Sequence, residues 1–296
     1  MQKKRILIIG SSNTDMVIKA ARIPVPGETI LGGEFKMGPG GKGANQAVAA
    51  ARLGGDVTFV CKVGRDVFGE NAVKGYQKDG INTDHILYSD KPSGVALILV
   101  DDQGENVISV APGANGDITP EDIESVRPVI EAADYVILQL EIPAETVAKA
   151  AEIGHAAGAC VILNPAPACK LPEEIFKNLS LITPNQTEIA LLTGVEGDIA
   201  LAMKKLHEMG VKDIILTLGS KGSAIWNGDG YELVPAQKVK AVDATAAGDT
   251  FCGGLCVGLS EGLSLKEAAE FATKASAMTV QKLGAQESIP HRSEIK

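Results

Sequence analysis

Short apolar runs alternate with longer helical patterns along most of this chain. The runs have the length of buried strands, and they cover residues 6–9, 57–63, 135–140, 160–163, 179–182 and 214–218. Helical patterns lie between them at residues 44–53, 120–131, 144–157 and 199–209. Strands that alternate with helices pair in parallel, and the helices then cover both faces of the sheet. We therefore predict an α/β fold built on a doubly wound, mostly parallel sheet.

Two helix starts carry capping signals. Thr119 precedes a proline and lies three residues before Asp122, and Ser264 lies three residues before Glu267. A Ser or Thr followed at this spacing by an acidic side chain can satisfy the first free N–H groups of a helix. We expect the second of these helices to run from residue 264 to about residue 282.

Two segments break the alternation. Residues 16–36 contain Pro24 and Pro26, and residues 95–110 hold two β-rich runs around the turn 101–104. Both segments are typical of antiparallel ribbons rather than of crossover units. We expect a single α/β domain over residues 1–296, with a small antiparallel β lid formed by segments at approximately 13–38 and 93–112. An inert edge hairpin would have the same pattern, so the sequence leaves that alternative open.

Composition excludes several classes of function. The chain has 296 residues, a net charge of −9 and a pI near 5.1, whereas a surface that binds nucleic acid is basic. No apolar run approaches the roughly 20 residues of a membrane span. The first residues lead directly into a strand-like run that is too short for the apolar core of a signal peptide. We expect a cytoplasmic protein that binds neither nucleic acid nor a membrane.

The cysteines and histidines show no metal-ligand spacing. The five cysteines and four histidines are scattered along the chain, and the count of cysteines is odd. Cys252 and Cys256 lie four residues apart among apolar neighbours, so we predict that they are small buried side chains. A metal site made only of protein ligands is therefore not expected.

Polar side chains follow several of the predicted strands. In open α/β sheets, ligands bind beyond the carboxyl ends of the strands. Polar residues at these ends therefore suggest a shared cleft. They are Asn13 and Asp15 after the first run, Glu141 after the run at 135–140, and Asn164, Asn185 and Thr217 at the ends of the later runs. Of these, Asn13, Asp15 and Glu141 would suit a polyhydroxylated ligand, because amide and carboxylate groups bind hydroxyl groups.

The glycine-rich segment 38–46 (GPGGKGANQ) satisfies the pattern G-x-G-x-x-G. A dinucleotide-binding loop should follow the first strand of a βαβ unit, with an acidic residue closing the next strand, and neither condition is met here. The segment also fails as a P-loop, because Lys42 is followed by Gly43 rather than by Ser or Thr. Two interpretations remain. One is a structural turn, and the other is a close approach of backbone to ligand, with Lys42 and Asn45 pointing inward.

The segment 242–254 places two carboxylates, Asp243 and Asp249, on either side of a run of small residues. Apolar residues then recur every four positions, as on one face of a helix. Small residues before a helix leave backbone N–H groups open, and the helix dipole adds partial positive charge there, so anions bind at such a terminus. A carboxylate beside an anion site indicates proton transfer, with Asp249 as general base in phosphoryl transfer. The alternative is that Asp249 only caps the helix, because Asp is a favoured N-cap residue.

In their order along the chain, these motifs resemble the ribokinase-type carbohydrate kinase family nearly from end to end. The glycine loop at 40–47 is similar to the N-terminal signature of that family, and residues 246–251 (AAGDTF) are similar to its C-terminal signature. Other segments match in order, namely 94–96 (GVA), 104–106 (GEN), 164–167 (NPAP), 183–188 (TPNQTE) and 284–286 (GAQ). The ordered set is far more specific than either signature alone.

The resemblance implies a reaction and its partners. In this family pattern, ATP with Mg²⁺ phosphorylates D-ribose at its 5-hydroxyl, and a monovalent cation such as K⁺ activates the enzyme. The resemblance also implies a ribokinase-like fold for the single domain and a homodimer in which each lid clasps its partner.

Matching positions imply the residues of the site. Catalysis would use Asp249 as base and an anion hole at Ala246, Ala247, Gly248 and Asp249. Ribose would meet Asn13, Asp15, Gly41, Lys42, Asn45, Glu141 and Asp249. ATP would meet Asn185, Glu188, Thr217, Gly219, Ser220, Gly222, Gly248 and Thr273. The monovalent cation would be held, largely through backbone carbonyls, by Asp243, Thr245, Thr279, Lys282, Gly284 and Ser288.

The chain departs from the family pattern at three positions. Ala244 stands where Thr is usual, Cys252 where Asn is frequent, and Thr273 where Asn is common. None of these changes removes a proposed catalytic group. The change at Thr273 would weaken or alter a contact to the nucleotide.

Three rival functions fit parts of the pattern. The first is another kinase of the same family, acting on a different sugar, a sugar phosphate or a nucleoside. A nucleoside pocket would use aromatic stacking, and the chain has only four Tyr, six Phe and one Trp. The second is a catalytically silent sugar-binding or regulatory protein, against which the presence of Asp249 argues. The third is a nicotinamide-dependent dehydrogenase, supported by the glycine pattern alone.

Overall fold

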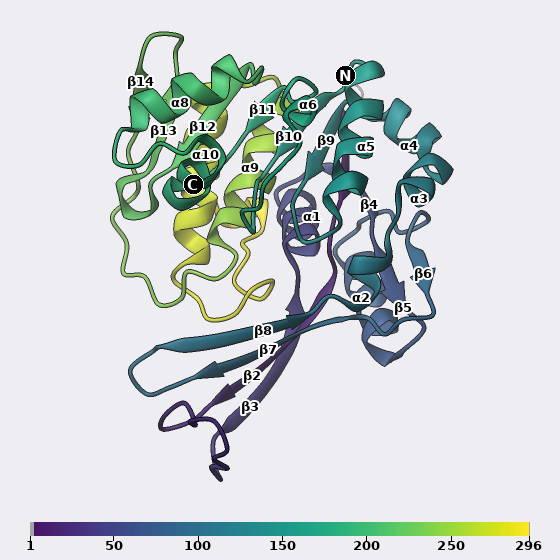
Figure 1. Cartoon of the computed structure of the whole chain (residues 1–296), viewed down its shortest axis with the longest axis vertical. Helices are drawn as coiled ribbons and strands as arrows, with labels where there is room; N and C mark the ends of the chain where they lie inside the picture. Colours follow the sequence, from purple (N-terminus) through teal and green to yellow (C-terminus); the bar gives the residue numbers. More distant parts are fainter. Residues whose placement is uncertain (1–2, 296) are drawn as a thin grey trace.

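The computed structural model describes residues 3–295 and centres on an eight-stranded sheet (Figure 1). The strand order is β14-β13-β12-β11-β10-β9-β1-β4, and every pair from β12 to β4 is parallel, whereas β13 and β14 pair antiparallel. The strands are β1 (Arg5–Ile9), β4 (Asp56–Val60), β9 (Tyr135–Leu138), β10 (Cys160–Leu163), β11 (Leu181–Ile182), β12 (Asp213–Thr217), β13 (Ser223–Trp226) and β14 (Tyr231–Val234). The predicted doubly wound α/β fold is confirmed.

Helices cover both faces of this sheet and create two apolar cores. Successive side chains of a strand point to opposite faces, so Ile6 and Ile8 of β1 enter one core and Leu7 and Ile9 the other. The first core is closed by α1 (Lys42–Arg52), α2 (Val67–Lys78), α9 (Ala247–Ser260) and α10 (Leu265–Thr279). The second is closed by α3 (Pro120–Ser125), α4 (Arg127–Ala132), α5 (Ala144–Ala156), α6 (Glu173–Phe176), α7 (Gln186–Thr193) and α8 (Ile199–Glu208). Within residues 3–295, none of the helices is both long and apolar enough to cross a membrane.

Several predicted boundaries are wrong. The run 57–63 is two strands, because only β4 stays in the main sheet, while β5 (Lys62–Gly64) pairs with β6 (Leu87–Ser89). The helix predicted at 120–131 divides at Val126, whose φ of −103° and ψ of 11° leave the helical region just before Pro128 supplies a new helix start. The last predicted helix ends at Thr279 instead of residue 282. Strands β13 and β14, which extend the sheet beyond β12, have no counterpart in the sequence prediction.

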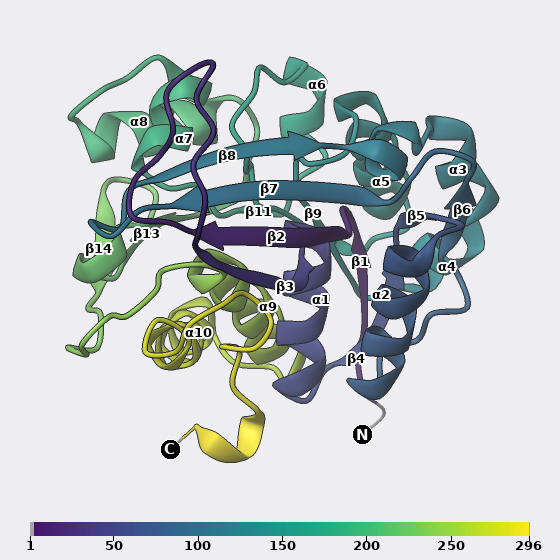
Figure 2. The same cartoon turned by 90° about the horizontal axis from the view of Figure 1, so that it is seen from below.

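The two segments that break the alternation form a separate four-stranded sheet, which we call the lid. Its strands are β2 (Asn13–Lys19), β3 (Glu34–Gly40), β7 (Gly94–Val100) and β8 (Asn106–Ala111), in the order β3-β2-β7-β8. As predicted, each segment is an antiparallel ribbon; a parallel pairing of β2 with β7 joins them. Figure 2 shows the lid strands side by side across the molecule, in front of the main sheet as seen from below.

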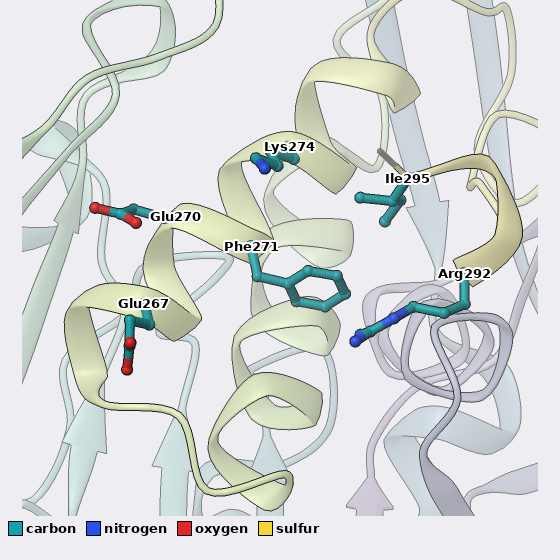
Figure 3. Close-up of a pocket in the computed structure, with 6 residues that line it drawn as sticks. All are labelled: Glu267, Glu270, Phe271, Lys274, Arg292 and Ile295. Carbon is teal, nitrogen blue, oxygen red and sulfur yellow. The ribbon is translucent and has the colours of Figure 1, made fainter.

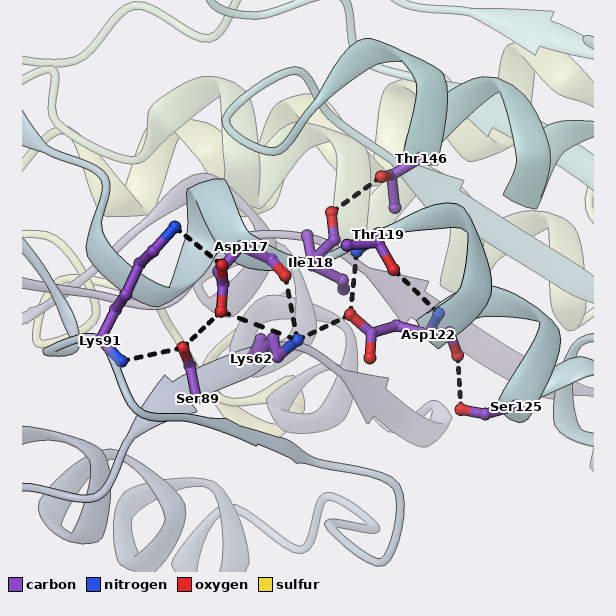
Figure 4. A network of polar contacts seen from close by, with 9 residues as sticks. All are labelled: Lys62, Ser89, Lys91, Asp117, Ile118, Thr119, Asp122, Ser125 and Thr146. Atoms are coloured by element: carbon purple, nitrogen blue, oxygen red, sulfur yellow. Dashed lines mark hydrogen bonds and ion pairs between the residues drawn. The ribbon is translucent and has the colours of Figure 1, made fainter.

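A polar cluster fixes the base of the lid to the body of the protein (Figure 4). Lys62 of β5 donates to the backbone oxygen of Asp117 at 2.9 Å and to Asp122 Oδ2 at 2.8 Å. Asp117 also pairs with Lys91 at 2.7 Å. Lys91 lies just before β7, and Asp117 ends the 3₁₀ helix η1 (Gly113–Asp117) just after β8. Both ends of this lid ribbon are therefore tied to the same lysine-centred cluster.

Candidate active site

The site begins where β1 ends and α1 starts, and the two meet backbone to backbone. A Cβ on Gly43 would lie 2.5 Å from the backbone nitrogen of Ser11 and 2.7 Å from the carbonyl carbon of Gly10. Gly41, which precedes α1, has a φ of 90°, a conformation that favours glycine. The close contact at Gly43 is between α1 and β1, so it gives this glycine a structural role, and the approach of backbone to ligand stays a prediction. The junction places Lys42 and Asn45, on either side of Gly43 along the chain, at the carboxyl end of β1.

Glu141 gathers several of the residues predicted to bind sugar. It follows β9, and its Oε2 accepts hydrogen bonds from Ser11 Oγ at 2.6 Å and from the backbone N–H of Lys42 at 3.0 Å. Asn13 Nδ2 lies 3.5 Å from the same oxygen. Residues from the end of β1, from the lid and from α1 thus converge on one carboxylate.

Asp249 is buried, and side-chain amides hold both of its carboxylate oxygens. Asn45 Nδ2 donates to Oδ2 at 3.0 Å, and Gln46 Nε2 donates to Oδ1 at 3.0 Å. Asp249 is the third residue of α9, whose N-cap is Ala246. The interpretation of Asp249 as a simple N-cap is therefore wrong, because its carboxylate binds two side chains of α1 and makes no capping hydrogen bond.

The site concentrates negative charge around one lysine. Burial, followed by the charges of Glu141 and Asp249, raises the pKa of Asp15 to about 6. Burial also raises the pKa of Asp249, against the opposing effects of Lys42 and the two amides. For Lys42, burial acts to lower the pKa, but the surrounding carboxylates, led by Asp249 and Glu141, outweigh it and raise that pKa. Lys42 is therefore a half-buried cation that these carboxylates keep charged.

The start of α9 has the form of an anion-binding terminus. Ala246 has a φ of 60°, and among residues 3–295 it is the one non-glycine residue with a positive φ. This strained turn directs the loop into the first turn of α9, where backbone N–H groups have no helical acceptor. The N–H of Ala247, however, already donates to the carbonyl of Ala244 at 3.2 Å. The N–H groups of Gly248 and Asp249 come before the first hydrogen bond of the helix itself. They are therefore the members of the predicted anion hole that have no acceptor within the helix.

The residues predicted to meet ATP lie along the adjacent strand ends. Asn185 caps α7 and shares a capping box with Glu188, and an isolated bridge pairs Asn185 with Thr217 at the end of β12. Burial raises the pKa of Glu188, which interacts with the charges of Lys42 and Asp249, so the nucleotide and sugar sets adjoin. Gly219, Ser220 and Gly222 lie at the 3₁₀ turn η2 (Gly219–Lys221) that follows β12.

Thr273 lies on α10 and is buried, and its hydroxyl donates to the carbonyl of Ala269 at 2.7 Å. That hydrogen bond stays within the helix. The predicted contact of Thr273 with the nucleotide is therefore the least supported of this set.

The residues predicted to hold the monovalent cation come from two loops that Asp243 joins. Asp243 Oδ1 accepts from the N–H and the hydroxyl of Thr245, at 2.9 and 2.6 Å, and Oδ2 accepts from the N–H of Gly284 at 2.9 Å. Burial acts to raise the pKa of Asp243, but these hydrogen bonds outweigh it and lower that pKa. Thr279 links the second loop to α9, because its hydroxyl donates to Thr250 Oγ1 at 3.0 Å.

The donor set around Asp243 fits a hard cation, because it consists of oxygen atoms. Lys282 directs its ammonium group to Glu294 at 3.3 Å, so only its backbone carbonyl remains for such a site. Ser288 is buried, with its hydroxyl on the carbonyl of Ala285. Throughout residues 3–295, no group of three or more His, Cys, Asp or Glu side chains has the arrangement of a metal site. The described part of the protein thus offers no carboxylate cluster for Mg²⁺.

Two sets of contacts between amide side chains were not expected from the sequence, although Asn13 and Asn164 were themselves expected at the cleft. Asn115 of η1 accepts from the N–H of Ser12 at 2.9 Å and donates to Asn13 Oδ1 at 2.7 Å, which fixes the orientation of the Asn13 amide. Gln46, Gln139 and Asn164 form a second set behind Asp249. Gln46 lies within the glycine motif and Asn164 within another motif. Only their positions in space show what they contact.

A separate surface hollow of about 260 Å³ lies between α10 and the chain's last turn (Figure 3). Its lining includes Phe271 and Arg292, and the guanidinium of Arg292 lies 4.2 Å from the centre of the Phe271 ring. Arg292 also pairs with Glu261 at 3.0 Å. None of the predicted site residues lines this hollow, so it is distinct from the site described above.

Comparison with known proteins places this geometry in a family. Residues 3–292 match the model of the pfkB family carbohydrate kinases. The chain is 40% identical over 297 residues to the ribokinase of Haemophilus influenzae, covering 99% of this chain and 97% of the relative. It is 44% identical over 299 residues to the bifunctional ribokinase/ribose-5-phosphate isomerase A of Fructilactobacillus sanfranciscensis, of whose length it spans 55%.

Solved structures agree with these relatives. The crystal structure of ribokinase from Thermotoga maritima matches with a TM-score of 0.92 at 41% identity, covering 98% of this chain and 97% of the other. Arabidopsis thaliana ribokinase, solved with ribose and ATP, matches with a TM-score of 0.91 at 31% identity, covering 99% of this chain and 98% of the other. This chain belongs to the pfkB family of carbohydrate kinases.

Proposed function

We propose that this protein is an ATP-dependent kinase of D-ribose that phosphorylates the 5-hydroxyl and yields D-ribose 5-phosphate and ADP. The observation that carries the proposal is the buried Asp249 carboxylate, which lies at the start of α9 beside the side chains proposed to bind the sugar. Full-length relatives named ribokinase, at about 40% identity, support the choice of ribose. The proposal treats residues 1–296 as one kinase unit, acting in the cytoplasm.

Asp249 is the general base in this proposal. Its carboxylate takes the proton of the sugar 5-hydroxyl as that oxygen forms a bond to the γ-phosphorus and the bond from phosphorus to the β,γ-bridging oxygen breaks, which releases ADP. A base acts best when its pKa approaches the working pH, and burial shifts the pKa of Asp249 in that direction. Phosphoryl transfer otherwise depends on positioning and on charge stabilisation.

The start of α9 stabilises the transferred phosphoryl group. The N–H groups of Gly248 and Asp249 point out of the first helical turn, and the positive φ of Ala246 sets the direction of that turn. Removing one preorganised donor of this kind typically costs about 10²–10³ in kcat. The N–H of Ala247 would join the hole only by leaving the carbonyl of Ala244.

Ribose binds through its hydroxyl groups to the cluster at the lid and the α1 terminus. Asp15, Asn13 and Glu141 supply acceptors and amide donors, while Lys42 offsets the charge of the carboxylates. Asn45 Oδ1 is buried and has no hydrogen-bond partner in the described part of the chain, so a sugar hydroxyl would satisfy it. Gly41 lets the backbone approach the ligand closely.

ATP occupies the strand ends beside this pocket, along Asn185, Glu188, Thr217 and the η2 turn. Mg²⁺ bound to the phosphate oxygens would offset their charge. Because the described residues hold no carboxylate cluster for a metal, the ion would arrive with the nucleotide and keep most of its waters.

K⁺ activation is expected to depend on Asp243, which joins the two loops that would hold the ion. The substitution Asp243→Ala should raise the K⁺ concentration for half-maximal activity by roughly tenfold or more, as found when the support of a metal site is removed. ADP release measured over a K⁺ series, with Na⁺ replacing K⁺ at constant ionic strength, checks this. Asp84→Ala, at an exposed position, is the control. An unchanged K⁺ curve for Asp243→Ala would contradict the assignment.

The lid is proposed to pair two copies of the chain. Cross-strand neighbours share a face of the sheet. The register places four apolar side chains on the face of the lid opposite to that of Asp15, namely Ile18, Phe35, Met37 and Leu97. Phe35 is 61% exposed and Leu97 56% exposed, which leaves an apolar sheet face open. A second lid would cover it.

The double variant Phe35→Asp/Leu97→Asp should therefore run as a monomer in light scattering at a concentration where the unmodified protein is a dimer. Leu201→Asp, whose side chain on α8 is 51% exposed, is the matched control and should leave the mass unchanged. A dimeric double variant, or a monomeric unmodified protein, would rule out pairing through this face.

Sugar-dependent ADP release tests the proposed function. With ATP, Mg²⁺ and K⁺ present, D-ribose should give a higher kcat/KM than 2-deoxyribose, fructose, fructose 6-phosphate and adenosine. A better substrate in this panel would reassign the acceptor within the family. No ADP release with any acceptor would favour a silent sugar-binding protein.

A further inference from the structure

Three buried amide side chains lie directly behind Asp249, and the proposed reaction does not use them as ligands. Gln46 and Gln139 are fully buried, and Asn164 nearly so. Gln46 Nε2 lies 3.0 Å from Asp249 Oδ1 and 3.1 Å from Asn164 Oδ1, and Gln139 Nε2 lies 2.7 Å from Gln46 Oε1. The amides come from α1 and from the ends of β9 and β10, so three elements meet behind the carboxylate.

One backbone carbonyl determines the direction of every hydrogen bond in this chain of amides. The carbonyl of Thr183 can only accept, so Asn164 must turn its Nδ2 toward it, at 3.0 Å. Asn164 Oδ1 therefore faces Gln46 and can only accept, so Gln46 must donate to it through Nε2. The second hydrogen of that Nε2 is left for Asp249. At the other end, Gln139 donates to Gln46 Oε1, which opposes a flip of the Gln46 amide.

We propose that Gln46 is a positioning residue that holds Asp249 in the ionised, correctly aimed state required of a base. The proposal rests on the proposed role of Asp249. Because Asn45 donates to the other oxygen, both oxygens of Asp249 face donors, and a proton on either oxygen would displace one of them. A fixed donor therefore favours the carboxylate over the carboxylic acid.

Other charged or titratable groups also face Asp249. They are Lys42 of α1, Glu141 after β9, Asp15 of the lid, Glu188 of α7 and Cys252 of α9. The substitution of Gln46 removes none of these groups. A shift in the titration of the base would then be due to the lost amide.

The substitution Gln46→Met keeps the length of the side chain and removes its donor. We expect the acid limb of the pH–rate profile to move up by roughly one pH unit. At the acid pH values where the limb lowers the rate, kcat for ribose should therefore fall about tenfold or more. The lost hydrogen bond stabilised the ionised carboxylate, so its removal raises the pKa of the base. At a given acid pH, a larger fraction of the enzyme then carries a protonated, inactive base. The ribose KM should change much less than kcat.

A second variant tests the proposal even if Gln46→Met does not fold. Gln139→Met removes the group that locks Gln46 but leaves the contact with Asp249 untouched. The variant leaves Gln46 Oε1 without its donor but also removes Gln139 Oε1, which is buried without a hydrogen-bond partner in residues 3–295. The two effects oppose each other, so Gln139→Met should lose less stability than Gln46→Met, which leaves both Asn164 Oδ1 and Gln139 Nε2 unpaired. We expect a smaller upward movement of the acid limb. Gln77→Met, at an exposed position of α2, is the control and should leave the profile unchanged.

The outcomes separate this inference from the function on which it rests. If Gln46→Met and Gln139→Met both fold, as judged by their melting temperatures, and their acid limbs match that of the unmodified protein, Gln46 has only a structural role. A lower melting temperature with an unmoved limb would also limit Gln46 to a structural role. If the unmodified protein shows no sugar-dependent ADP release, the proposed function itself fails.

Discussion

Replacing Asp249 with Asn should lower kcat for ribose phosphorylation by at least about 10²-fold, within the range of general-base catalysis, and change ribose affinity little. The carboxamide fills the same volume but cannot take the proton of the 5-hydroxyl. The amide nitrogen of the new side chain replaces one carboxylate oxygen. Its hydrogens would then face the hydrogen that Asn45 or Gln46 donates, so that one of these two hydrogen bonds is lost. Steady-state kinetics for kcat, together with calorimetric titration of ribose for affinity, separate the two effects.

The structure also predicts how this variant behaves apart from the rate. The acid limb of the pH–rate profile should disappear, because the group whose ionisation produces it is gone. Asp229→Asn, at an exposed turn, is the matched control and should keep normal turnover and a normal profile. Near-normal turnover of Asp249→Asn would remove Asp249 from the role of base.

The second large effect is expected at Gly43, where α1 meets β1. A Cβ at this position would lie 2.5 Å from the backbone nitrogen of Ser11, 2.7 Å from the Gly10 carbonyl carbon and 2.8 Å from the Gly10 Cα. All three atoms belong to the backbone, and β1 lies inside the sheet between β9 and β4. Neither partner can give way without moving a central element. Gly43→Ala should therefore lower the free energy of unfolding by about 3 kcal/mol or more.

Activity should fall with stability in Gly43→Ala, because Lys42 and Asn45 depend on this junction for their place in the site. The matched control is Gly75→Ala in α2, where no atom lies within 4 Å of the added Cβ. That substitution should raise stability by about 0.5–1 kcal/mol, as alanine is favoured over glycine inside helices. Denaturant unfolding of both variants checks the pair. A wild-type midpoint for Gly43→Ala would show that α1 and β1 pack less closely than the structure indicates.

The fold was predictable because its strands are buried on both faces and are separated by helices of normal length. What periodicity could not show is where a continuous apolar run leaves one sheet for another. Cys61, between β4 and β5, is as apolar and as buried as Val60, and the single charged residue that follows it, Lys62, already belongs to β5, so no turn signal marks the break in the sequence. Strands β13 and β14 were not predicted because both are short runs of mixed polarity, separated by the turn 227–230.

The site was predictable in its parts but not in its contacts. Asp249 could be a cap or a base from sequence alone, because Asp suits both. The structure decides because α9 starts at Ala247, after Ala246 adopts a positive φ that alanine rarely takes. Asp249 then falls in the first turn, where its carboxylate meets α1. The amides of Gln46, Gln139 and Asn164 lie far apart in sequence, and no local pattern specifies which buried donor meets which acceptor.

The most direct test of the proposed function is the identity of the product. The protein, incubated with ATP, Mg²⁺, K⁺ and D-ribose, should yield a single sugar phosphate whose phosphorus couples to the two protons of C5 in NMR spectra, and Asp249→Asn should yield almost none. 5-Deoxyribose, which lacks the accepting hydroxyl, should give no product. Phosphate on any other carbon, or equal product from 5-deoxyribose, would contradict the assigned reaction.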